Sequence, residues 1–218
     1  LTPEMQANVW AVRKVGLGLL QSQPGDSKPR EFIEDVAVPV EVLGEHVRRL
    51  QAIFAEFEVS AAYYAHAGTG CLHIRPQLSF RSAEDRQKLN QIMQAVFTEV
   101  KRLGGALSGE HGDGLLRTAY NRALFGEQVY RAFEEIKAIW DPQNLLNPGK
   151  VVGTPAKLAN LRYNPSDQPL DLPASPLSFT AQGGFIGLVE QCNGSGEGRQ
   201  SGGGMCPSFQ ATPREEQT

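Results

Sequence analysis

Residues 108–114 read Ser-Gly-Glu-His-Gly-Asp-Gly, so the carboxylate of Glu110 and the imidazole of His111 are adjacent in a glycine-rich segment. Imidazole and carboxylate are the groups that proteins use most often for proton transfer and for binding metal ions. Glycine permits positive φ angles and lets the backbone approach a ligand closely. This segment is therefore the first candidate for a chemical site.

Two further histidines flank the sequence Gly-Thr-Gly at 68–70, so three of the chain's four histidines lie in two glycine-rich segments. If residues 69–70 form a two-residue hairpin turn, His66 and His73 become cross-strand partners on one face of a sheet. The Cβ atoms of such partners are about 5 Å apart, which allows both rings to bind one metal ion. A third ligand is needed, and Glu110 is the candidate. The spacing leaves open a hydrogen-bonded surface pair of histidines beside an ordinary turn.

The hydrophobic pattern predicts the elements that position these segments. β-Branched and apolar residues predict strands at 32–39, 60–66, 71–78 and 106–108, and helical periodicity predicts helices at 42–57 and 82–103. The second helix has Ser82 as its N-cap with Asp85 three residues later, and Gly104-Gly105 ends it. This order is the ferredoxin-like split-βαβ pattern, an α+β fold with an antiparallel sheet and helices packed on one face. The fold carries no activity by itself.

Further helices are predicted on both sides of this unit, at 3–20 and at 127–140, the latter ended by Asp141-Pro142. After Lys150 the periodicity disappears while Pro, Gly and Ser accumulate. We therefore expect residues beyond about 155 to be extended or poorly ordered, with one turn of helix near 185–190.

The overall composition limits the class of protein. The chain has 218 residues, a net charge of -3 and a pI near 5.9, which argues against electrostatic binding of nucleic acid. There is no apolar run of the ~18 residues that a transmembrane helix needs. The start, Leu-Thr-Pro-Glu, lacks an initiator Met and the features of a signal peptide. We expect a fragment cut from a longer polypeptide, with a processed precursor as the alternative.

Single residues outside the two glycine-rich segments receive structural interpretations. Three cysteines are too few and odd in number for a disulfide framework, so a reducing compartment is expected. This favours a cytoplasmic protein, or one at the membrane periphery. Cys71 is interpreted as a small buried hydrophobic residue, and His46 as an exposed residue of the helix at 42–57.

Five motifs in order resemble a known family. They are Trp10-Ala-Val-Arg13-Lys14, Glu34-Asp35-Val-Ala-Val-Pro39, His66-Ala-Gly-Thr-Gly-Cys-Leu-His73, Ser108-Gly-Glu-His-Gly-Asp-Gly114 and Asp141-Pro-Gln-Asn-Leu-Leu-Asn-Pro-Gly-Lys150. Together they resemble the C-terminal cap region of FAD-linked dehydrogenases of the vanillyl-alcohol oxidase superfamily. That group includes D-lactate, glycolate and D-2-hydroxyglutarate dehydrogenases. The resemblance spans about residues 8–152.

The C-terminal cysteines extend the resemblance. Cys192-Asn-Gly-Ser-Gly and Met205-Cys206-Pro-Ser-Phe resemble the start of the iron–sulfur module in long bacterial members, which carry FAD and [4Fe-4S] centres on one polypeptide. The implied organisation is a cap domain at 1–152, a linker at 153–184 and the start of an iron–sulfur module at 185–218. FAD would then be bound mainly by a domain upstream, and the cluster would form only in the full-length protein.

The resemblance also implies roles for the histidine and glutamate residues. His66, His73 and Glu110 correspond to the ligands of a divalent metal such as zinc, and His111 corresponds to the catalytic base. A D-2-hydroxy acid would chelate the metal and lose its hydroxyl proton to His111, while the α-hydrogen leaves as hydride to the flavin.

Four more residues receive roles from the same resemblance. Arg13 or Arg75 would hold a substrate carboxylate, and Asn147 and Lys150 would contact the cofactor. Many relatives have Asp and Asn at the positions of Thr69 and Cys71, which places an Asn-mediated substrate contact in doubt. Gly198 stands where a second cluster cysteine is expected, so Cys192 and Cys206 alone cannot supply the usual four thiolates.

The leading hypothesis is therefore a fragment of an FAD-dependent 2-hydroxy-acid dehydrogenase that passes electrons on to an iron–sulfur centre. Its partners would be the small-molecule substrate and the FAD-binding and iron–sulfur domains of the same polypeptide. One alternative is a metal-binding ferredoxin-like module without redox activity. Another is an interaction domain in which the histidines are only structural.

Overall fold

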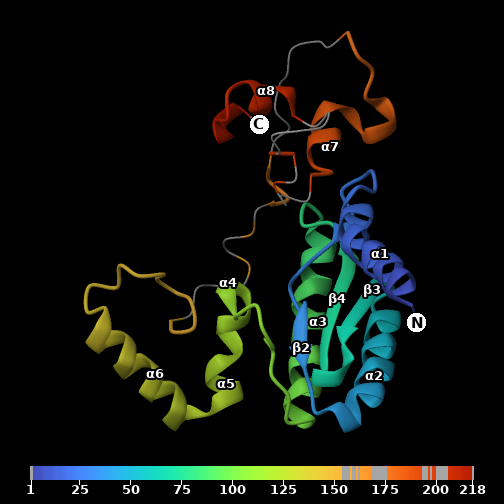
Figure 1. The fold of residues 1–218 in the computed structure, drawn as a ribbon. Coiled ribbons are helices and arrows are strands. Elements are labelled where there is room, and N and C mark those ends of the chain that lie inside the picture. The colour runs from blue at the N-terminus through green and yellow to red at the C-terminus, as the bar shows by residue number, and fades with distance from the viewer. Residues whose placement is uncertain are drawn as a thin grey trace. The chain divides into compact units, whose positions relative to one another are not determined.

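The computed structural model describes residues 2–153 without a break and, beyond them, residues 158, 161, 163–167, 176–192, 196, 198–199 and 206–217 (Figure 1). The chain forms two compact units. One comprises Asp26–Leu172, and the other combines Leu1–Gly25 with Pro173–Thr218. All of the predicted metal-ligand and base residues lie in the first of these, which we call the sheet unit.

The sheet is built around one long strand, β4 (Cys71–Leu78). Strand β3 (Ala61–His66) pairs antiparallel with one edge of it. Strands β1 (Lys28–Pro29) and β2 (Asp35–Ala37) also pair antiparallel with β4, and Figure 1 shows β2 on the side of β4 away from β3. The predicted strand at 32–39 is thus shorter than expected, because residues 32–34 form a bend and a turn between β1 and β2, although Glu34 O still accepts from Ile74 N of β4 at 2.9 Å.

The predicted fourth strand is reduced to a single antiparallel bridge between Ala37 and Ala106. Ala37 N donates to Ala106 O at 3.0 Å, and Ala106 N donates to Ala37 O at 2.8 Å. Residue 106 therefore extends the sheet beyond β2, and the lateral order 106–β2–β4–β3 is that of the split-βαβ pattern. The predicted α+β class with an antiparallel sheet is confirmed.

Two amphipathic helices cover one face of the sheet. They are α2 (Leu43–Glu56), preceded by a 3₁₀ turn at Val40–Val42, and α3 (Ala83–Arg102). Ser82 caps α3 as predicted, with Oγ accepting from Asp85 N at 3.2 Å. The Asp85 carboxylate accepts from Ser79 N at 2.7 Å, not from the cap residue as in a full capping box.

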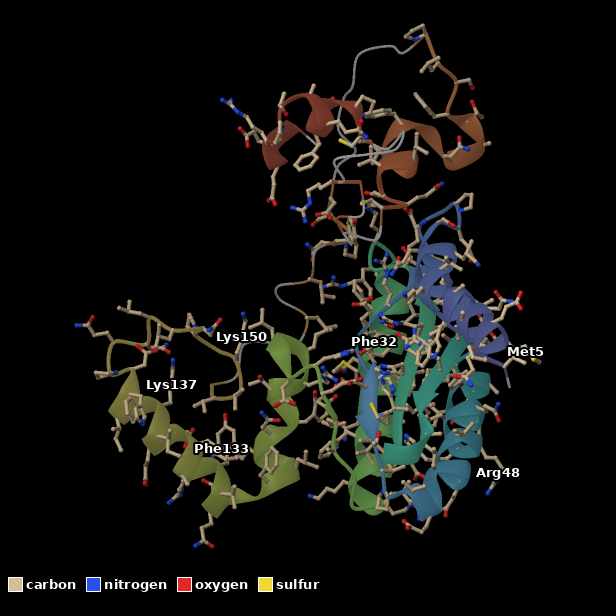
Figure 2. The ribbon with its side chains drawn as sticks, in the orientation of Figure 1. Met5, Phe32, Arg48, Phe133, Lys137 and Lys150 are labelled. Carbon is tan, nitrogen blue, oxygen red and sulfur yellow. The ribbon has the colours of Figure 1, made fainter. Side chains whose placement is uncertain are left out.

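The core lies between these helices and the sheet. It contains Leu72 and Ile74 of β4 together with the apolar stripes of both helices, namely Leu50, Ile53, Phe54, Leu89, Ile92, Met93, Val96, Phe97 and Val100. Phe32, labelled in Figure 2, is fully buried in the same cluster. Because side chains alternate along a strand, Cys71, His73 and Arg75 project from the opposite face of β4. The candidate site is on that face.

The hairpin between β3 and β4 differs from the expected two-residue turn. Residues Ala67–Thr69 form a 3₁₀ turn and Gly70 follows with φ +70°. His66 therefore pairs with Cys71, and His73 pairs with Tyr64. Glycine is required at position 70, because a Cβ there would lie 1.9 Å from the carbonyl oxygen of Val38.

The sheet unit continues into a helical arm. Short helices at Gly114–Arg117 (α4) and Asn121–Phe125 (α5) flank a 3₁₀ turn at Thr118–Tyr120 and lead to α6, Glu127–Trp140. The prediction of a helix at 127–140 is confirmed. After α6 ends, Lys137 (Figure 2) pairs with Asp141 and donates to Leu146 O at 2.5 Å, which fixes the following loop against the last turn.

The second unit contains α1 (Pro3–Gln21), which matches the predicted helix at 3–20. Its C-terminal part has α7 (Gly184–Val189) and α8 (Pro207–Ala211), with 3₁₀ turns at Thr180–Gln182 and Glu215–Gln217. The predicted turn of helix near 185–190 is confirmed by α7. Much of the segment that we expected to be extended lies outside the described residues. No helix among the described residues has both the length and the apolar character needed to cross a membrane.

His46 is buried, contrary to the expectation of an exposed helical residue. Its exposed fraction is 0%, and it lies on the same stripe of α2 as Leu50, Ile53 and Phe54. Within the described residues neither ring nitrogen has a hydrogen-bond partner. Burial lowers the pKa of His46, and this outweighs the charge of Glu99, which acts in the opposite direction.

This buried ring predicts a pH-dependent stability. The folded chain keeps His46 neutral while the unfolded chain binds a proton below about pH 6.5, so the free energy of unfolding falls as the pH falls from 7.5 to 5. The contribution of one proton is at most ~1.4 kcal/mol per pH unit. Chemical denaturation of wild type and His46→Leu at both pH values should show a smaller loss in the variant. Equal losses in the two proteins would contradict the assignment.

Candidate active site and metal centre

The structure brings the four predicted site residues together on the face of the sheet opposite α2 and α3. His66 ends β3, His73 lies in β4, and Glu110 and His111 follow the bridge at residue 106. Glu110 Oε1 is 2.9 Å from His73 Nε2, 3.6 Å from His66 Nε2 and 3.6 Å from His111 Nε2. The cluster therefore has one carboxylate oxygen surrounded by three imidazole nitrogens.

The histidines still share a face although the hairpin register was wrong. The predicted pairing placed His66 opposite His73, whereas the observed partner of His73 is Tyr64, two residues earlier. A shift of two residues preserves the side of the sheet to which a side chain points. The ring centroids of His66 and His73 are 5.1 Å apart, and those of His73 and His111 are 5.4 Å apart.

Exposure changes sharply across the cluster. The side chain of His73 is 3% exposed, whereas those of His66, Glu110 and His111 are 51%, 42% and 50% exposed. His73 is thus the buried residue of the site. The other three residues are accessible to a small molecule that approaches from solvent.

Asp35 holds the loop that carries Glu110 and His111. Its Oδ2 accepts hydrogen bonds from the backbone N–H of Glu110 at 2.9 Å and of His111 at 2.7 Å, and from Ser108 Oγ at 2.9 Å. Gly109 N also donates to the carbonyl of Asp35 at 2.7 Å. A Cβ at Gly109 would meet Ala37, Asp35 and Cys71 at 3.2 Å, so glycine permits this close approach.

Arg117 supplies the charge that balances Asp35. Its Nη1 pairs with Asp35 Oδ1 and donates to Leu107 O at 2.9 Å, and its Nη2 donates to Gly112 O. Burial would raise the pKa of the Asp35 carboxyl, but the His111 N–H, the Arg117 guanidinium and the Glu110 N–H together hold that pKa well below its usual range. Arg117 thus links the carbonyl groups at both ends of the loop, residues 107 and 112, to the Asp35 carboxylate.

Glu34 contacts the imidazole rings of His73 and His111, whereas Asp35 binds the backbone of the loop. Glu34 Oε1 is 3.0 Å from His73 Nδ1, and Oε2 is in close contact with His111 Nδ1. Arg75 Nη2 donates to Oε1 at 2.7 Å, and the Tyr64 hydroxyl donates to it at 3.3 Å. The Tyr64 ring also stacks on His73 with centroids 4.5 Å apart.

The Glu34-Asp35 motif carries no predicted role for either residue. A signal was present: two adjacent acidic residues interrupt the apolar segment Phe32–Pro39, and both are buried, at 4% and 0% exposed. Buried carboxylates need charged or hydrogen-bonding partners. Arg117, with 8% of its surface exposed, was missed as well.

Arg75, a predicted substrate contact, is 4% exposed in the structure. Besides Glu34, its guanidinium pairs with Glu31 and donates to the Tyr64 hydroxyl at 2.9 Å. Burial alone would lower the pKa of Arg75, but the hydrogen bond to Tyr64 and the charges of Glu31 and Glu34 outweigh it and raise that pKa. The guanidinium is therefore committed to protein partners, chiefly the carboxylate that holds the rings.

The other predicted binding residues lie outside the strands and the loop that carry the cluster. Arg13 lies on α1, in the second unit. Lys150 Nζ donates to Asn147 Oδ1 at 3.2 Å in the loop after α6. Within the described part of the chain, no hydrogen bond or ion pair joins Asn147 or Lys150 to the histidines. Their roles stay predictions.

The donor set fits a metal ion. His66, His73 and Glu110 each offer one ligand atom within 4.8 Å of the others, and two nitrogens with one carboxylate oxygen suit zinc. His73 Nδ1 faces Glu34, so Nε2 presents a lone pair. That lone pair lies 2.9 Å from Glu110 Oε1, yet no described residue hydrogen-bonds to Nε2.

Cys71 lies beneath this cluster, and its expected burial is confirmed at 6% exposed. Its Sγ is 3.9 Å from Glu110 Oε1. Burial, followed by the charges of Glu110, Asp35 and Glu34, raises the pKa of the thiol to about 11. Cys71 is therefore a neutral thiol at physiological pH and packs below the carboxylate.

The C-terminal cysteines lie in the second unit, where Cys192 and Cys206 are free thiols. A Cβ built on Gly198 would be 3.8 Å from the Cβ of Cys206. The position at which a further cluster cysteine was expected is therefore adjacent to Cys206.

The sequence match is consistent with this geometry. Residues 2–151 match the family described as FAD linked oxidases, C-terminal domain. The chain belongs to this family. It is 32% identical over 208 residues to the D-2-hydroxyglutarate dehydrogenase of Escherichia coli K12, which covers 93% of this chain and 19% of the relative.

Two other relatives have a similar sequence identity to this chain. The D-2-hydroxyglutarate dehydrogenase of Pseudomonas putida is 32% identical over 227 residues, or 98% of this chain and 21% of the relative. The glycolate oxidase subunit GlcD of Bacillus subtilis is 31% identical over 130 residues, or 60% of this chain and 28% of the relative. This member of the FAD-linked oxidase C-terminal family thus spans between 19% and 28% of the length of these relatives.

The contacts of Asp35 predict a large effect of its removal. Asp35→Asn leaves Arg117 buried without its counter-ion, which typically costs about 3–5 kcal/mol in the free energy of unfolding. Amide exchange at Glu110 and His111 should also accelerate. Because the folded pKa is depressed, wild type should lose this stabilisation as the pH falls below about 4, and the variant should not.

Urea denaturation and hydrogen exchange measure both effects. Asp26→Asn is the matched control, since Asp26 is an exposed carboxylate paired with Arg81 at 2.9 Å. Such exposed pairs contribute only about 0–1 kcal/mol. A loss in Asp35→Asn no larger than in the control would show that Asp35 does not anchor the loop.

Proposed function

We propose that this chain supplies the substrate side of an FAD-dependent dehydrogenase that oxidises a D-2-hydroxy acid to the 2-oxo acid. The observation that supports it most is the convergence of His66, His73, Glu110 and His111 around one carboxylate oxygen. Relatives named D-2-hydroxyglutarate dehydrogenase, D-lactate dehydrogenase and glycolate oxidase support the substrate class. FAD would be bound mainly by a domain outside this chain, and an iron–sulfur domain of the same polypeptide would receive the electrons.

His66, His73 and Glu110 would hold a divalent ion such as Zn²⁺. When bound, such an ion lowers the pKa of a hydroxyl coordinated beside it. The open side of this ligand set, where three side chains are about half exposed, leaves room for a small hydroxy acid.

His111 would accept the hydroxyl proton at Nε2. Its Nδ1 is occupied by Glu34, and its ring is half exposed, so Nε2 is the nitrogen that a substrate can reach. FAD, when bound, supplies the acceptor for the α-hydrogen as hydride. Loss of the proton and of the hydride from one carbinol group yields the 2-oxo acid.

Binding of the substrate's carboxylate requires a cation. Arg13 and Arg75 both carry the guanidinium that this role needs. We favour Arg13, because Arg75 is buried and bound to Glu31 and Glu34. Asn147 and Lys150 are proposed to contact the cofactor.

The proposal predicts the effect of replacing the base. In the flavin-loaded holoenzyme containing this chain, His111→Asn should lower the rate of flavin reduction by D-2-hydroxyglutarate, D-lactate or glycolate by about 10²–10⁴-fold. Metal content should stay unchanged, because His111 is not among the proposed ligands. Thermal stability should fall, because the buried Glu34 Oε2 loses its contact with the ring.

Stopped-flow flavin bleaching measures this rate, with Glu84→Gln as a control, because Glu84 is an exposed carboxylate that pairs with Lys88 on α3 at 3.1 Å. A rate of flavin reduction in His111→Asn within tenfold of wild type would contradict the role of His111 as the base. A chain that binds metal but whose holoenzyme reduces no flavin with any of the three acids would favour the metal-binding module without redox activity.

A further inference from the structure

One carboxylate, Glu34, faces the same nitrogen in two different imidazoles. Its Oε1 is 3.0 Å from His73 Nδ1, and its Oε2 is in close contact with His111 Nδ1. A carboxylate can only accept hydrogen bonds. Each Nδ1 must therefore carry a proton, and in a neutral ring the lone pair is then on Nε2.

The surroundings of Glu34 keep it in this arrangement. Its side chain is 5% exposed, so water does not compete for the two oxygens. Arg75 Nη2 donates to Oε1 at 2.7 Å and neutralises the charge, and Tyr64 donates to Oε1 and stacks on His73. Arg75 and Tyr64 thus hold the carboxylate in place, and its two oxygens face the rings of His73 and His111.

The opposite nitrogens of the two rings point to one place. His73 Nε2 and His111 Nε2 lie 2.9 Å and 3.6 Å from the same atom, Glu110 Oε1. Within the described residues, His73 Nε2 makes no hydrogen bond. The protonation of both rings thus determines what this shared space can bind.

We propose that Glu34 is a positioning residue that sets the Nδ1–H tautomer of both His73 and His111. One carboxylate thereby prepares two functions, a ligand nitrogen on His73 and a proton-accepting nitrogen on His111. The assignment of these two functions rests on the proposed function, whereas the tautomers follow from the contacts of Glu34 alone. Partners of this kind fix ring orientation and tautomer in other metal sites.

Glu34→Gln separates this role from a merely structural one. The amide has one acceptor oxygen and one donor NH₂, so it cannot accept from both rings. Arg75 requires the oxygen at the Oε1 position, and His73 Nδ1–H shares that oxygen. The NH₂ group then faces His111 Nδ1, which must become an acceptor. We expect His111 to change to the Nε2–H tautomer while His73 keeps its own.

Long-range ¹H–¹⁵N correlation spectra of the 218-residue chain at neutral pH distinguish protonated from unprotonated ring nitrogens, with signals assigned from His73→Gln and His111→Gln. Wild type should show Nδ1–H in both rings, and Glu34→Gln should show the change at His111. Glu99→Gln is the matched control, because Glu99 is a carboxylate with 6% exposure that pairs with Arg102 at 2.9 Å. It should leave both tautomers unchanged.

An Nε2–H tautomer in either wild-type ring overturns the proposal, and this result does not depend on whether Glu34→Gln folds. Unchanged tautomers in a folded Glu34→Gln also overturn it. In the holoenzyme, Glu34→Gln should lower kcat more than it raises KM. If the tautomers behave as stated but kcat is unaffected, the base role of His111 fails while the positioning by Glu34 holds.

Discussion

The arrangement of this site depends on two adjacent carboxylates, Glu34 and Asp35, that are buried at the start of β2. Removing a carboxylate from water costs several kcal/mol unless charged or hydrogen-bonding groups surround it. All four oxygens have such partners: Arg75, Tyr64 and two imidazoles around Glu34, and Arg117, Ser108 and two backbone amides around Asp35. Several of these partners belong to the site itself, namely the rings of His73 and His111 and the backbone amides of Glu110 and His111. Stability of the fold and geometry of the site therefore depend on the same contacts.

The separate contacts of Asp35 and Glu34 explain how an exposed cluster can be well positioned. Asp35 fixes the backbone from which Glu110 and His111 extend, and Glu34 fixes the rings of His73 and His111. The groups that would meet a substrate are half exposed, whereas the groups that hold them are buried. Side chains fixed from behind need little reorganisation when a ligand binds, which favours both metal binding and proton transfer.

Much of this architecture could be predicted from local patterns. Ser82 and the apolar stripe after it determine α3, and the order of strands and helices gives the split-βαβ sheet. The hairpin register was off by two residues, because the 3₁₀ turn at Ala67–Thr69 depends on the fit of Gly70 against Val38. The two histidines still share a face, since the error was an even number. The expectation of an exposed His46 was wrong, although its spacing from Leu50, Ile53 and Phe54 places it on the buried stripe.

The contacts of Glu34, Asp35 and Arg117 could not be predicted from spacing, because their partners are distant in sequence and reach them only after the sheet forms. The central claim is that His66, His73 and Glu110 form one metal site whose rings bind through Nε2. Anomalous diffraction at the zinc edge from crystals of this chain grown with Zn²⁺ tests it directly. The account predicts a peak about 2.0–2.2 Å from both Nε2 atoms and a Glu110 carboxylate oxygen. A peak bound to His73 Nδ1, or no peak at this cluster, would contradict it.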